Sequence, residues 1–490
     1  MEQYYTITLF LLIVVTTVTF LKNLFSKSNK LPPGPTPWPI IGNILKLGDK
    51  PHHVVAELSK IYGPIMTLKL GSITTVVISS PEVAQEMFLK HDLDFSGRAI
   101  TDAMRATNHD QVSMVFLPIS PKWRNLRKIA TIHLFSSHQL DASQDLRLKK
   151  VNELVEYARQ CSESGLPIDV GKAAFVTTLN LLSNTIFSID LATHDSSNSQ
   201  EFKDIIWTLL EEAARPNVSD FFPLVRNLDL QGVLRRATDY ANKLLGIFEE
   251  IIDERLKNPN DTKDDFLGTL LKLVDNKELS LDELKHMLVD LFTAGTDTSS
   301  STLEWAITEL LRNPEKMKKA QTELEQVFGK HEFIQESDLS NLPYIQAIVK
   351  ETFRLHPPTP FLIPYKAEKP VELGKYFVPI NAHVWVNVWF IGRNPSVWTN
   401  PLLFSPERFL NKEINVRGRH FELIPFGAGR RICPGLPLAY RMVHLMLASL
   451  LHSFNWKYHG TNSYKDIDVE EKFGITLQKA QPLQAIALPR

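Results

Sequence analysis

Cysteine is almost absent from this chain of 490 residues, which contains only Cys161 and Cys433. Two cysteines cannot form the disulfide framework that stabilises many secreted domains, so a reducing compartment is expected. Net charge is also nearly absent, because 54 basic residues are balanced by 55 acidic residues. The chain therefore has no overall electrostatic attraction for nucleic acid, and we expect no nucleic-acid partner.

Glycine is scarce relative to proline, with 21 glycines against 30 prolines, and no internal repeat is visible. The proline content predicts irregular connections between elements. Hydrophobic residues make up 43% of the chain and charged residues 22%. These values exclude a collagen-like or mainly disordered chain and allow a large hydrophobic core.

The segment from Tyr4 to Leu21 carries no charge. As a helix it spans about 27 Å, close to the thickness of the hydrocarbon layer of a membrane. A cleaved signal peptide is the alternative, but no basic residue precedes the segment and no small-residue cleavage site follows it. Lysines follow the segment at positions 22, 27 and 30, which predicts that the rest of the chain is cytosolic.

Three regions are expected along the chain. Residues 1–21 form the N-terminal membrane anchor, and residues 22–43 form a basic and proline-rich hinge that ends in the sequence LPPGPTPWPIIGN. Its prolines prevent the anchor helix from continuing, so the hinge is interpreted as a semi-rigid spacer. Residues 44–490 form the main globular domain, and membrane lipid is an expected partner of the chain.

Hydrophobic patterns in this domain predict a mainly α fold with a smaller β-rich lobe. Strands are expected as a hairpin over residues 65–80 and over 371–378 and 383–388. Helices are expected over residues 81–90, 121–135, 146–162, 204–213, 234–256, 281–312, 314–328, 342–354 and 437–454.

The loop PFGAGRRICPG, residues 425–435, surrounds Cys433 with glycines and two arginines. A free cysteine is often only a small buried apolar residue, but a cationic neighbourhood favours the thiolate that binds metal. One thiolate cannot complete a structural zinc site, which needs four ligands, whereas a haem iron takes a single protein ligand. The glycines open no strand–turn–helix unit, so they do not indicate a nicotinamide site.

This loop resembles the haem-binding loop of the cytochrome P-450 family at Phe426, Gly429, Arg431, Cys433 and Gly435. Three further segments agree in the right order, and the anchor and hinge are similar to those of microsomal members. The resemblance therefore covers nearly the whole chain and implies the cytochrome P-450 fold. It also implies a haem b cofactor with Cys433 as the axial thiolate ligand of the iron.

The segment AGTDTSS, residues 294–300, lies within the predicted helix 281–312. Gly295 leaves room beside the helix axis, and Asp297 and Thr298 place a carboxylate and a hydroxyl next to each other. Taken alone, these residue types indicate only a weakened helix. The resemblance implies that Thr298 hydrogen-bonds the activated oxygen and that Asp297 helps to relay protons through water, so these are the expected catalytic residues.

The segment ETFR places Glu351 and Arg354 on one helical face, and PERF supplies Arg408. On an exposed helix such a pair contributes little to stability. The resemblance implies that the three residues form a buried charge network with a structural role.

Trp123 and Arg127 lie four residues apart on one face of a predicted helix. The resemblance implies that they bind the haem propionates together with Arg431, which suits an indole N–H and two guanidinium groups. Tyr365 stands where many members of the family have an arginine or histidine, so the origin of that propionate contact is left open.

Electrons must come from another protein, because the chain has no flavin or nicotinamide motif. We expect an NADPH-cytochrome P-450 reductase, which would dock near Arg124, Lys128 and Arg430. The resemblance and the predicted anchor imply a single-pass protein of the endoplasmic reticulum membrane with a cytosolic catalytic domain.

Substrate identity is predicted from the segments that line the pocket in the family. They supply apolar residues here, which favour a small hydrophobic substrate that reacts with O2. The amino-acid sequences of several segments resemble those of the plant subfamily that includes geraniol and diterpene hydroxylases, so the expected substrate is a terpenoid. The predicted lining residues are Met104, Val112, Phe116, Phe222, Leu291, Ala294, Phe361, Leu362, Ile363, Phe473 and Ile475.

Alternative interpretations remain at this point. An alkaloid or a phenolic substrate would also suit an apolar pocket. An O2-independent isomerase or dehydratase would not need Asp297 and Thr298, and a non-enzymatic haem sensor would not need a proton relay. Outside the motifs, His52 and His53 are expected at the surface and Cys161 is interpreted as an ordinary free thiol.

Overall fold

The structure, a computed structural model, describes residues 31–194, 197–258, 263, 265–329, 334–460 and 464–490. The predicted anchor at residues 4–21 lies outside the described residues. Within the described ranges, no helix is both long and apolar enough to cross a membrane.

The main sheet begins with the predicted hairpin, in which β1 and β2 pair antiparallel around Gly71. Gly71 has a φ of 57°, a conformation that favours glycine. Strand β8 continues the sheet parallel to β2, and β5 and β3 follow antiparallel in the order β1-β2-β8-β5-β3. The strand bounds are β1 (Ile65–Leu70), β2 (Ile73–Ile78), β3 (Gly97–Arg98), β5 (Tyr365–Lys366) and β8 (His383–Val386).

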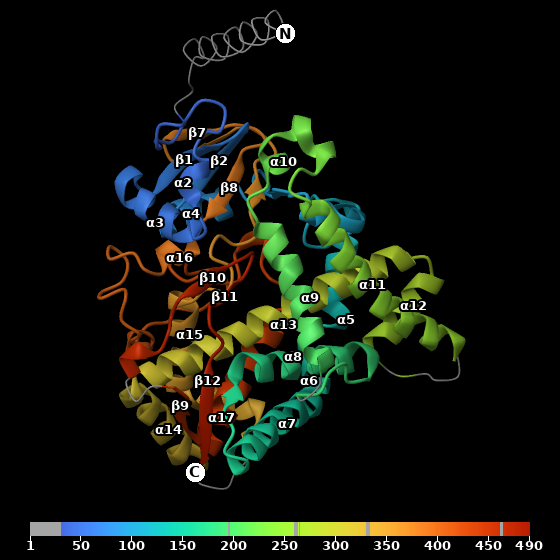
Figure 1. Cartoon of the computed structure of the whole chain (residues 1–490), viewed down its shortest axis with the longest axis vertical. Helices are drawn as coiled ribbons and strands as arrows, with labels where there is room; N and C mark the ends of the chain where they lie inside the picture. Colours follow the sequence, from blue (N-terminus) through green and yellow to red (C-terminus); the bar gives the residue numbers. More distant parts are fainter. Residues whose placement is uncertain (1–30, 195–196, 259–262, 264, 330–333, 461–463) are drawn as a thin grey trace, which may run out of the picture.

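Short helices and one further hairpin complete this sheet-rich lobe, which is at the top of Figure 1. The predicted strand over residues 371–378 is in fact a hairpin, because Gly374 with a φ of 62° turns the chain between two short strands. The remaining elements here are α2 (Ile44–Leu47), α3 (Pro51–Tyr62), α4 (Pro81–Lys90), α16 (Val388–Ile391), β6 (Val371–Leu373) and β7 (Tyr376–Val378).

The larger part of the molecule is helical, and α13 crosses its centre (Figure 1). Ser280 and Glu283 begin α13 with a capping box, in which each side chain accepts a hydrogen bond from the other residue's backbone N–H. The long helices are α5 (Pro121–His133), α7 (Gln144–Glu163), α8 (Val170–Phe187), α9 (Ser197–Ala214), α11 (Val233–Lys257), α13 (Leu281–Arg312), α14 (Pro314–Phe328), α15 (Pro343–Leu355) and α17 (Leu436–Ser453). Shorter turns and helices are α6 (Ser137–Ala142), α10 (Val218–Phe221), α12 (Phe266–Asp275), η1 (Ala103–Gln111), η2 (Pro223–Leu228), η3 (Glu336–Asn341), η4 (Pro406–Phe409), η5 (Gly429–Arg431) and η6 (Tyr464–Asp466).

Helix α8 is absent from the sequence prediction although it packs along α13. Fifteen of its 18 residues are buried, because α7, α12 and α13 surround it. A helix that is buried on nearly all sides, with its polar residues spread around it, has no distinct polar and apolar faces from which it can be recognised. Helices α3 and α12 were also missed.

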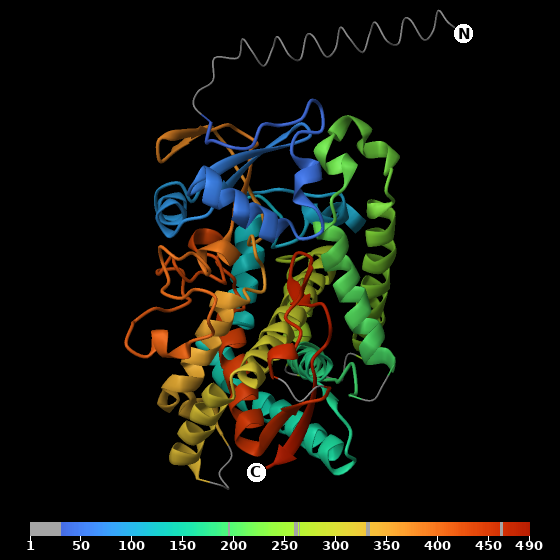
Figure 2. The ribbon, with the colours of Figure 1, turned by 60° about the vertical axis from the view of Figure 1, so that its left-hand side comes forward.

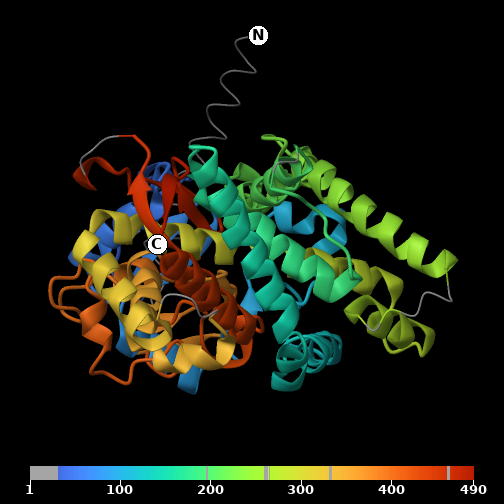
Figure 3. The same cartoon turned by 90° about the horizontal axis from the view of Figure 1, so that it is seen from below.

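The strands near the C-terminus, which the sequence patterns did not predict, do not join the main sheet. Strand β12 pairs with β9 and with β4, a two-residue strand that lies some 300 residues earlier in the chain. These strands lie among the helices at the opposite end of the molecule (Figures 1 and 3). The bounds are β4 (Ile168–Asp169), β9 (Phe454–Tyr458) and β12 (Gln484–Pro489), and the separate hairpin is β10 (Glu471–Phe473) with β11 (Leu477–Lys479).

The described part of the hinge, residues 31–43, is fastened to strand β1. The backbone N–H of Thr67 donates to the Pro33 carbonyl at 2.8 Å. A Cβ atom on Gly34 would lie 1.9 Å from the Thr67 carbonyl oxygen, so only glycine fits there. This part of the predicted hinge therefore packs against the sheet.

Helices α9 and α11 lie side by side, and the segment between them reaches the sheet (Figure 2). The Ser72 backbone N–H donates to the Phe221 carbonyl at 2.9 Å. The Asp102 N–H donates to Asp220 Oδ1 at 2.7 Å. These contacts join residues 217–226 to the β1–β2 turn and to the loop that contains η1, and the η1 loop borders the cavity described below.

Candidate active site

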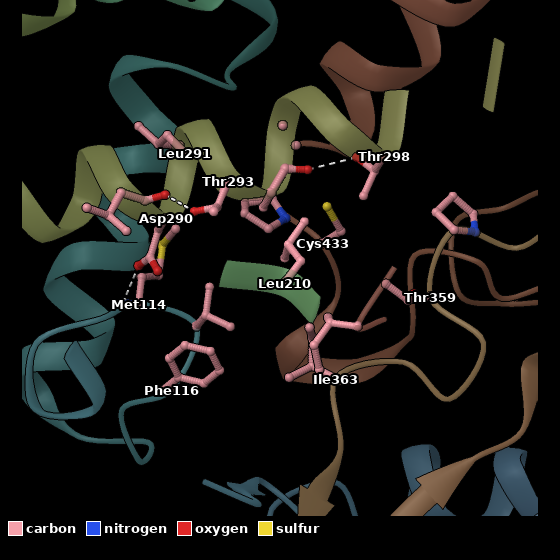
Figure 4. Close-up of a pocket in the computed structure, with 18 of the residues that line it drawn as sticks. Met114, Phe116, Leu210, Asp290, Leu291, Thr293, Thr298, Thr359, Ile363 and Cys433 are labelled. Atoms are coloured by element: carbon pink, nitrogen blue, oxygen red, sulfur yellow. Dashed lines mark hydrogen bonds between the residues drawn. The ribbon is translucent and has the colours of Figure 1, made fainter. Parts of the chain in front are cut away.

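A cavity of about 340 Å³ lies between α13, α9, the η1 loop and the loop that carries Cys433. Leu291, Ala294 and Thr298 face it from α13, and Phe116 and Ile363 approach from loops (Figure 4). The lining is mainly apolar, as a cavity for a hydrophobic substrate requires.

The Cys433 thiol lines this cavity. The backbone N–H of Cys433 donates to the Phe426 carbonyl at 3.0 Å, which closes the loop. Gly429 has a φ of 66°, and a Cβ atom there would lie 2.3 Å from Asp92 Oδ1. Burial raises the pKa of the Cys433 thiol, whereas backbone N–H groups of the next helix and the Arg127 charge lower it.

Three guanidinium groups border the same end of the cavity, namely Arg98, Arg127 and Arg431. Within the part of the chain that the structure describes, none of the three forms an ion pair with a carboxylate. They donate to carbonyls instead, as Arg98 does to Ile363 at 2.6 Å and Arg431 to Ser96 at 3.0 Å. Burial, followed by repulsion from Arg98, lowers the pKa of Arg431 to about 9.

Arg98 is the residue that the sequence analysis missed beside Tyr365. Strands β3 and β5 place Arg98 directly opposite Tyr365, and its guanidinium lies 4.6 Å from the centre of the Tyr365 ring. Tyr365 is itself buried, so it supports the arginine. A two-residue strand gives no sequence signal, so this pairing was visible only in the structure.

Trp123 has a different contact from the expected one. Its indole N–H donates to the Met114 carbonyl at 3.0 Å, and its ring lies 5.1 Å below the Arg431 guanidinium. In this structure the Trp123 ring therefore packs against Arg431, and its N–H is engaged by the Met114 carbonyl.

Thr298 and Asp297 have different hydrogen-bond partners, and of the two only Thr298 lines the cavity. The Thr298 hydroxyl donates to the Ala294 carbonyl at 2.7 Å and lines the cavity. Asp297 is buried on the other side of α13, where Oδ2 accepts a hydrogen bond from Thr476 at 2.6 Å and Oδ1 accepts one from Gln478. Burial raises the pKa of Asp297.

The structure brings together Glu351, Arg354 and Arg408. Two nitrogens of Arg354 donate to Glu351, each at 2.7 Å, and Arg408 donates to it at 3.1 Å. Glu351 and Arg354 are almost completely buried.

Most of the predicted pocket residues line the cavity. Those that do are Met104, Phe116, Leu291, Ala294, Leu362, Ile363 and Ile475. Val112, Phe222, Phe361 and Phe473 do not. Phe361 packs instead against Trp385 and Phe473 in a separate cluster, and Phe222 lies against Gly71.

His52 contradicts its expected place at the surface, because it is fully buried. Its Nε2 lies 2.8 Å from Glu471 Oε2, and His53 Nε2 lies 3.2 Å from the same oxygen. These residues fasten α3 to β10. Cys161 is buried and forms no disulfide.

The chemistry of these residues fits haem. A haem iron takes one thiolate, and the two propionates need cationic donors. One thiol and three guanidinium groups without carboxylate partners meet both needs at one end of the cavity, among the residues that the structure describes.

Comparisons with known proteins agree with this site. Residues 32–484 match the family model described as cytochrome P-450. The chain is 54% identical to cytochrome P-450 76AD1 of Beta vulgaris over 96% of each chain, and 52% identical to geraniol 8-hydroxylase of Catharanthus roseus over 99% of each. A zebra fish cytochrome P-450 solved with progesterone gives a TM-score of 0.75 at 25% identity, over 90% of this chain and 99% of the other.

Proposed function

This chain belongs to the cytochrome P-450 family of haem-thiolate monooxygenases, and we propose that it hydroxylates a small terpenoid. Members of the family receive electrons from a reductase and act on hydrophobic substrates with O2. The observation that carries the proposal is an apolar cavity that leads to the Cys433 thiol. The similarity to geraniol 8-hydroxylases of Catharanthus roseus and Swertia mussotii, each 52% identical, supports a terpenoid.

Each part of the site has a proposed role. When bound, haem supplies the chemistry that inserts one oxygen atom of O2 into a C–H bond. Cys433 would hold the iron, and Arg98, Arg127 and Arg431 would hold the propionates. The backbone around Phe426, Gly429 and Gly435 would lie close to the ring, because glycine permits close approach.

Thr298 is proposed to position a proton at the reacting oxygen. Its hydroxyl proton is donated to the Ala294 carbonyl, which leaves Oγ1 free to accept a hydrogen bond from the cavity side. Asp297 does not line the cavity and accepts hydrogen bonds from Thr476 and Gln478, so it would join a proton relay only through intervening water. In the described conformation Asp297 holds the turn that places Ile475 in the cavity.

A terpenoid panel tests the substrate class. Purified protein, reductase and NADPH would be incubated with terpenoids, an alkaloid set and a phenolic set, and the products identified by mass spectrometry. We expect O2-dependent hydroxylation of a terpenoid. Products from only the alkaloids or phenols would contradict the terpenoid assignment, and turnover without O2 consumption would instead indicate an isomerase or dehydratase.

Thr298→Ala should separate electron consumption from product formation. Loss of a positioned proton donor or acceptor typically lowers a rate by about 100- to 10,000-fold, and water replaces part of this effect. We expect a larger loss of product than of NADPH oxidation, with hydrogen peroxide released as the difference. The measurement is peroxide released per NADPH at saturating substrate. Coupling equal to that of the parent would show that Thr298 is only a helix residue.

We propose that the chain is held at the endoplasmic reticulum membrane, with residues 1–21 as anchor, 22–43 as hinge and 44–490 as the cytosolic domain. Exposed apolar residues support this proposal. Trp38, Ile40 and Leu45 are 65–79% exposed, and Leu224 and Leu228 are at least as exposed as Trp38. These residues lie in two segments that contact the sheet-rich lobe.

Removal of residues 1–30 should move the protein from the membrane fraction to the soluble fraction.

We propose that a reductase docks on a basic surface formed by Arg124, Lys128 and Arg430. The first two are exposed on α5, and Arg430 is half-exposed while it pairs with Asp92 at 3.1 Å. Because the attraction is electrostatic, added salt should slow reduction.

Reversal of charge at Arg124 and Lys128 should lower the rate of reduction at limiting reductase and low salt by about tenfold. The matched control is Lys318→Glu, an exposed lysine on α14. The rate would be followed by stopped-flow reduction of the haem. Full turnover with NADPH and no reductase, or unchanged rates in the α5 variants, would refute this proposal.

A further inference from the structure

One charged group lines the cavity away from the end that is formed by Cys433 and the three arginines. Among the described residues that line the cavity, Asp290 is the one carboxylate. It comes from α13 and is only 5% exposed. Figure 4 shows it with Met114, away from Thr298 and Cys433.

Asp290 retains capacity to accept another hydrogen bond. Its Oδ1 accepts from Ser113 Oγ at 2.7 Å and lies 3.0 Å from His109 Nε2, while Oδ2 accepts from the Met114 N–H at 2.8 Å. An ionised carboxylate has about four acceptor positions. Three are used, so one position on Oδ2 remains.

The surroundings hold Asp290 in place. His109 contacts Asp290 through Nε2 and His286 through Nδ1, at 2.7 Å. Burial, followed by repulsion from His109, lowers the pKa of His286 to about 4. The backbone just before His109 is strained, because Thr107 has a φ of 55° although it is β-branched. A strained backbone conformation persists only where surrounding contacts hold it, and such conformations are common at binding sites.

The position of Asp290 along α13 sets its distance from Thr298. Asp290, Ala294 and Thr298 are spaced four residues apart and so share one face of the helix. Eight residues correspond to a rise of about 12 Å. The space beside this face is lined by apolar residues such as Leu291 and Phe116.

Neighbouring polar groups do not offer an equivalent acceptor. The hydroxyls of Thr178, Thr293 and Thr298 donate to carbonyls of their own helices, so each can accept from the cavity only as a neutral oxygen, which is a weaker acceptor than a carboxylate. The guanidinium groups at the Cys433 end are donors and accept nothing. A wholly apolar ligand would leave the remaining acceptor position of Asp290 buried and unpaired, which is unfavourable.

We propose that Asp290 accepts a hydrogen bond from a hydroxyl at one end of the substrate. The substrate is then a terpenoid alcohol that is oxidised at a carbon far from its hydroxyl. This inference rests on the proposed terpenoid function and adds that Asp290 recognises the hydroxyl group of the substrate.

The test compares an acyclic monoterpene alcohol with its methyl ether, which has the same skeleton and no donor. In the parent protein, kcat/KM should be at least about tenfold higher for the alcohol, the size of effect expected from one hydrogen bond to a charged group. In Asp290→Asn this ratio should fall towards one, because the amide can also donate to the ether. Dissociation constants from equilibrium dialysis should show the same change.

Two control variants separate recognition from loop stability. Ser113→Ala loosens the η1 loop but keeps the carboxylate, so both substrates should be affected alike. Thr293→Val alters the same face of α13 and should also leave the ratio unchanged. A ratio that is unchanged in Asp290→Asn, or that collapses equally in Ser113→Ala, would overturn the proposal.

The remaining outcomes are also decisive. If neither compound binds, the terpenoid assignment fails and this inference fails with it. If both are oxidised equally by the parent protein, only this inference fails. If the primary amine of the same skeleton is preferred to the alcohol by tenfold or more, Asp290 recognises an ammonium group and the alcohol proposal is overturned.

Discussion

Replacement of Cys433 with alanine is expected to abolish the absorption band that carbon monoxide gives with a reduced, thiolate-ligated haem. Cys433 is the one cysteine among the described residues that line the cavity. His109 is the histidine among the described lining residues, and it could replace Cys433 only as a nitrogen ligand. Its two ring nitrogens already contact Asp290 and His286. No neighbouring group can therefore supply a thiolate in its place.

The measurement separates ligation from haem retention. We expect the carbon monoxide band and the monooxygenase activity to be lost in Cys433→Ala. Haem content should fall less, because Arg98, Arg127 and Arg431 remain to bind the propionates. The matched control is Cys161→Ala, since Cys161 lies on α7 and does not line the cavity. An unchanged band in Cys433→Ala, or its loss in Cys161→Ala, would disprove the assignment of the ligand.

Glu351→Gln is expected to destabilise the protein by about 3 to 5 kcal/mol, the usual result of removing one partner from a buried ion pair. Glu351 accepts hydrogen bonds from Arg354, Arg408 and the backbone of Ser405. Glutamine preserves the volume but directs an NH₂ group at a guanidinium. Two cations would then share a buried site without an anion.

The free energy of unfolding from denaturant titration tests this value. The control is Glu57→Gln, because Glu57 pairs with Lys60 at the same i,i+3 spacing while both side chains are exposed. An exposed pair of this kind contributes up to about 1 kcal/mol. If Glu351→Gln and Glu57→Gln lower the free energy of unfolding by similar amounts, the buried Glu351 network contributes no more to stability than an exposed ion pair.

Local sequence patterns predicted the elements whose ends are fixed by neighbouring residues. Helix α4 has the expected bounds because the Ser80 hydroxyl accepts the Val83 N–H and Pro81 follows at the first helical position. The Cys433 loop was found for the same reason, since its spacing is contained in eleven residues. In both cases the information lies within a few positions of the chain.

The unpredicted features depend on residues that are distant in sequence. Arg98 reaches the haem end only because β3 pairs with β5, more than 260 residues later. Asp290 acquires its role from the η1 loop, about 180 residues earlier. Side-chain direction also escaped prediction, because the Asp297 carboxylate is directed away from the cavity by Thr476 and Gln478.

Helix α8 has a consequence for the synthesis of the protein. Its apolar surface is covered largely by α13, which begins at residue 281, whereas α8 ends at residue 187. From the end of α8 to the end of α13 at residue 312 there are 125 residues, which a ribosome adds in roughly 6 to 25 s at about 5 to 20 residues per second. During that interval a helix that is buried on nearly all sides in the folded protein lacks its main partner, so the growing chain is most exposed to aggregation before α13 is complete.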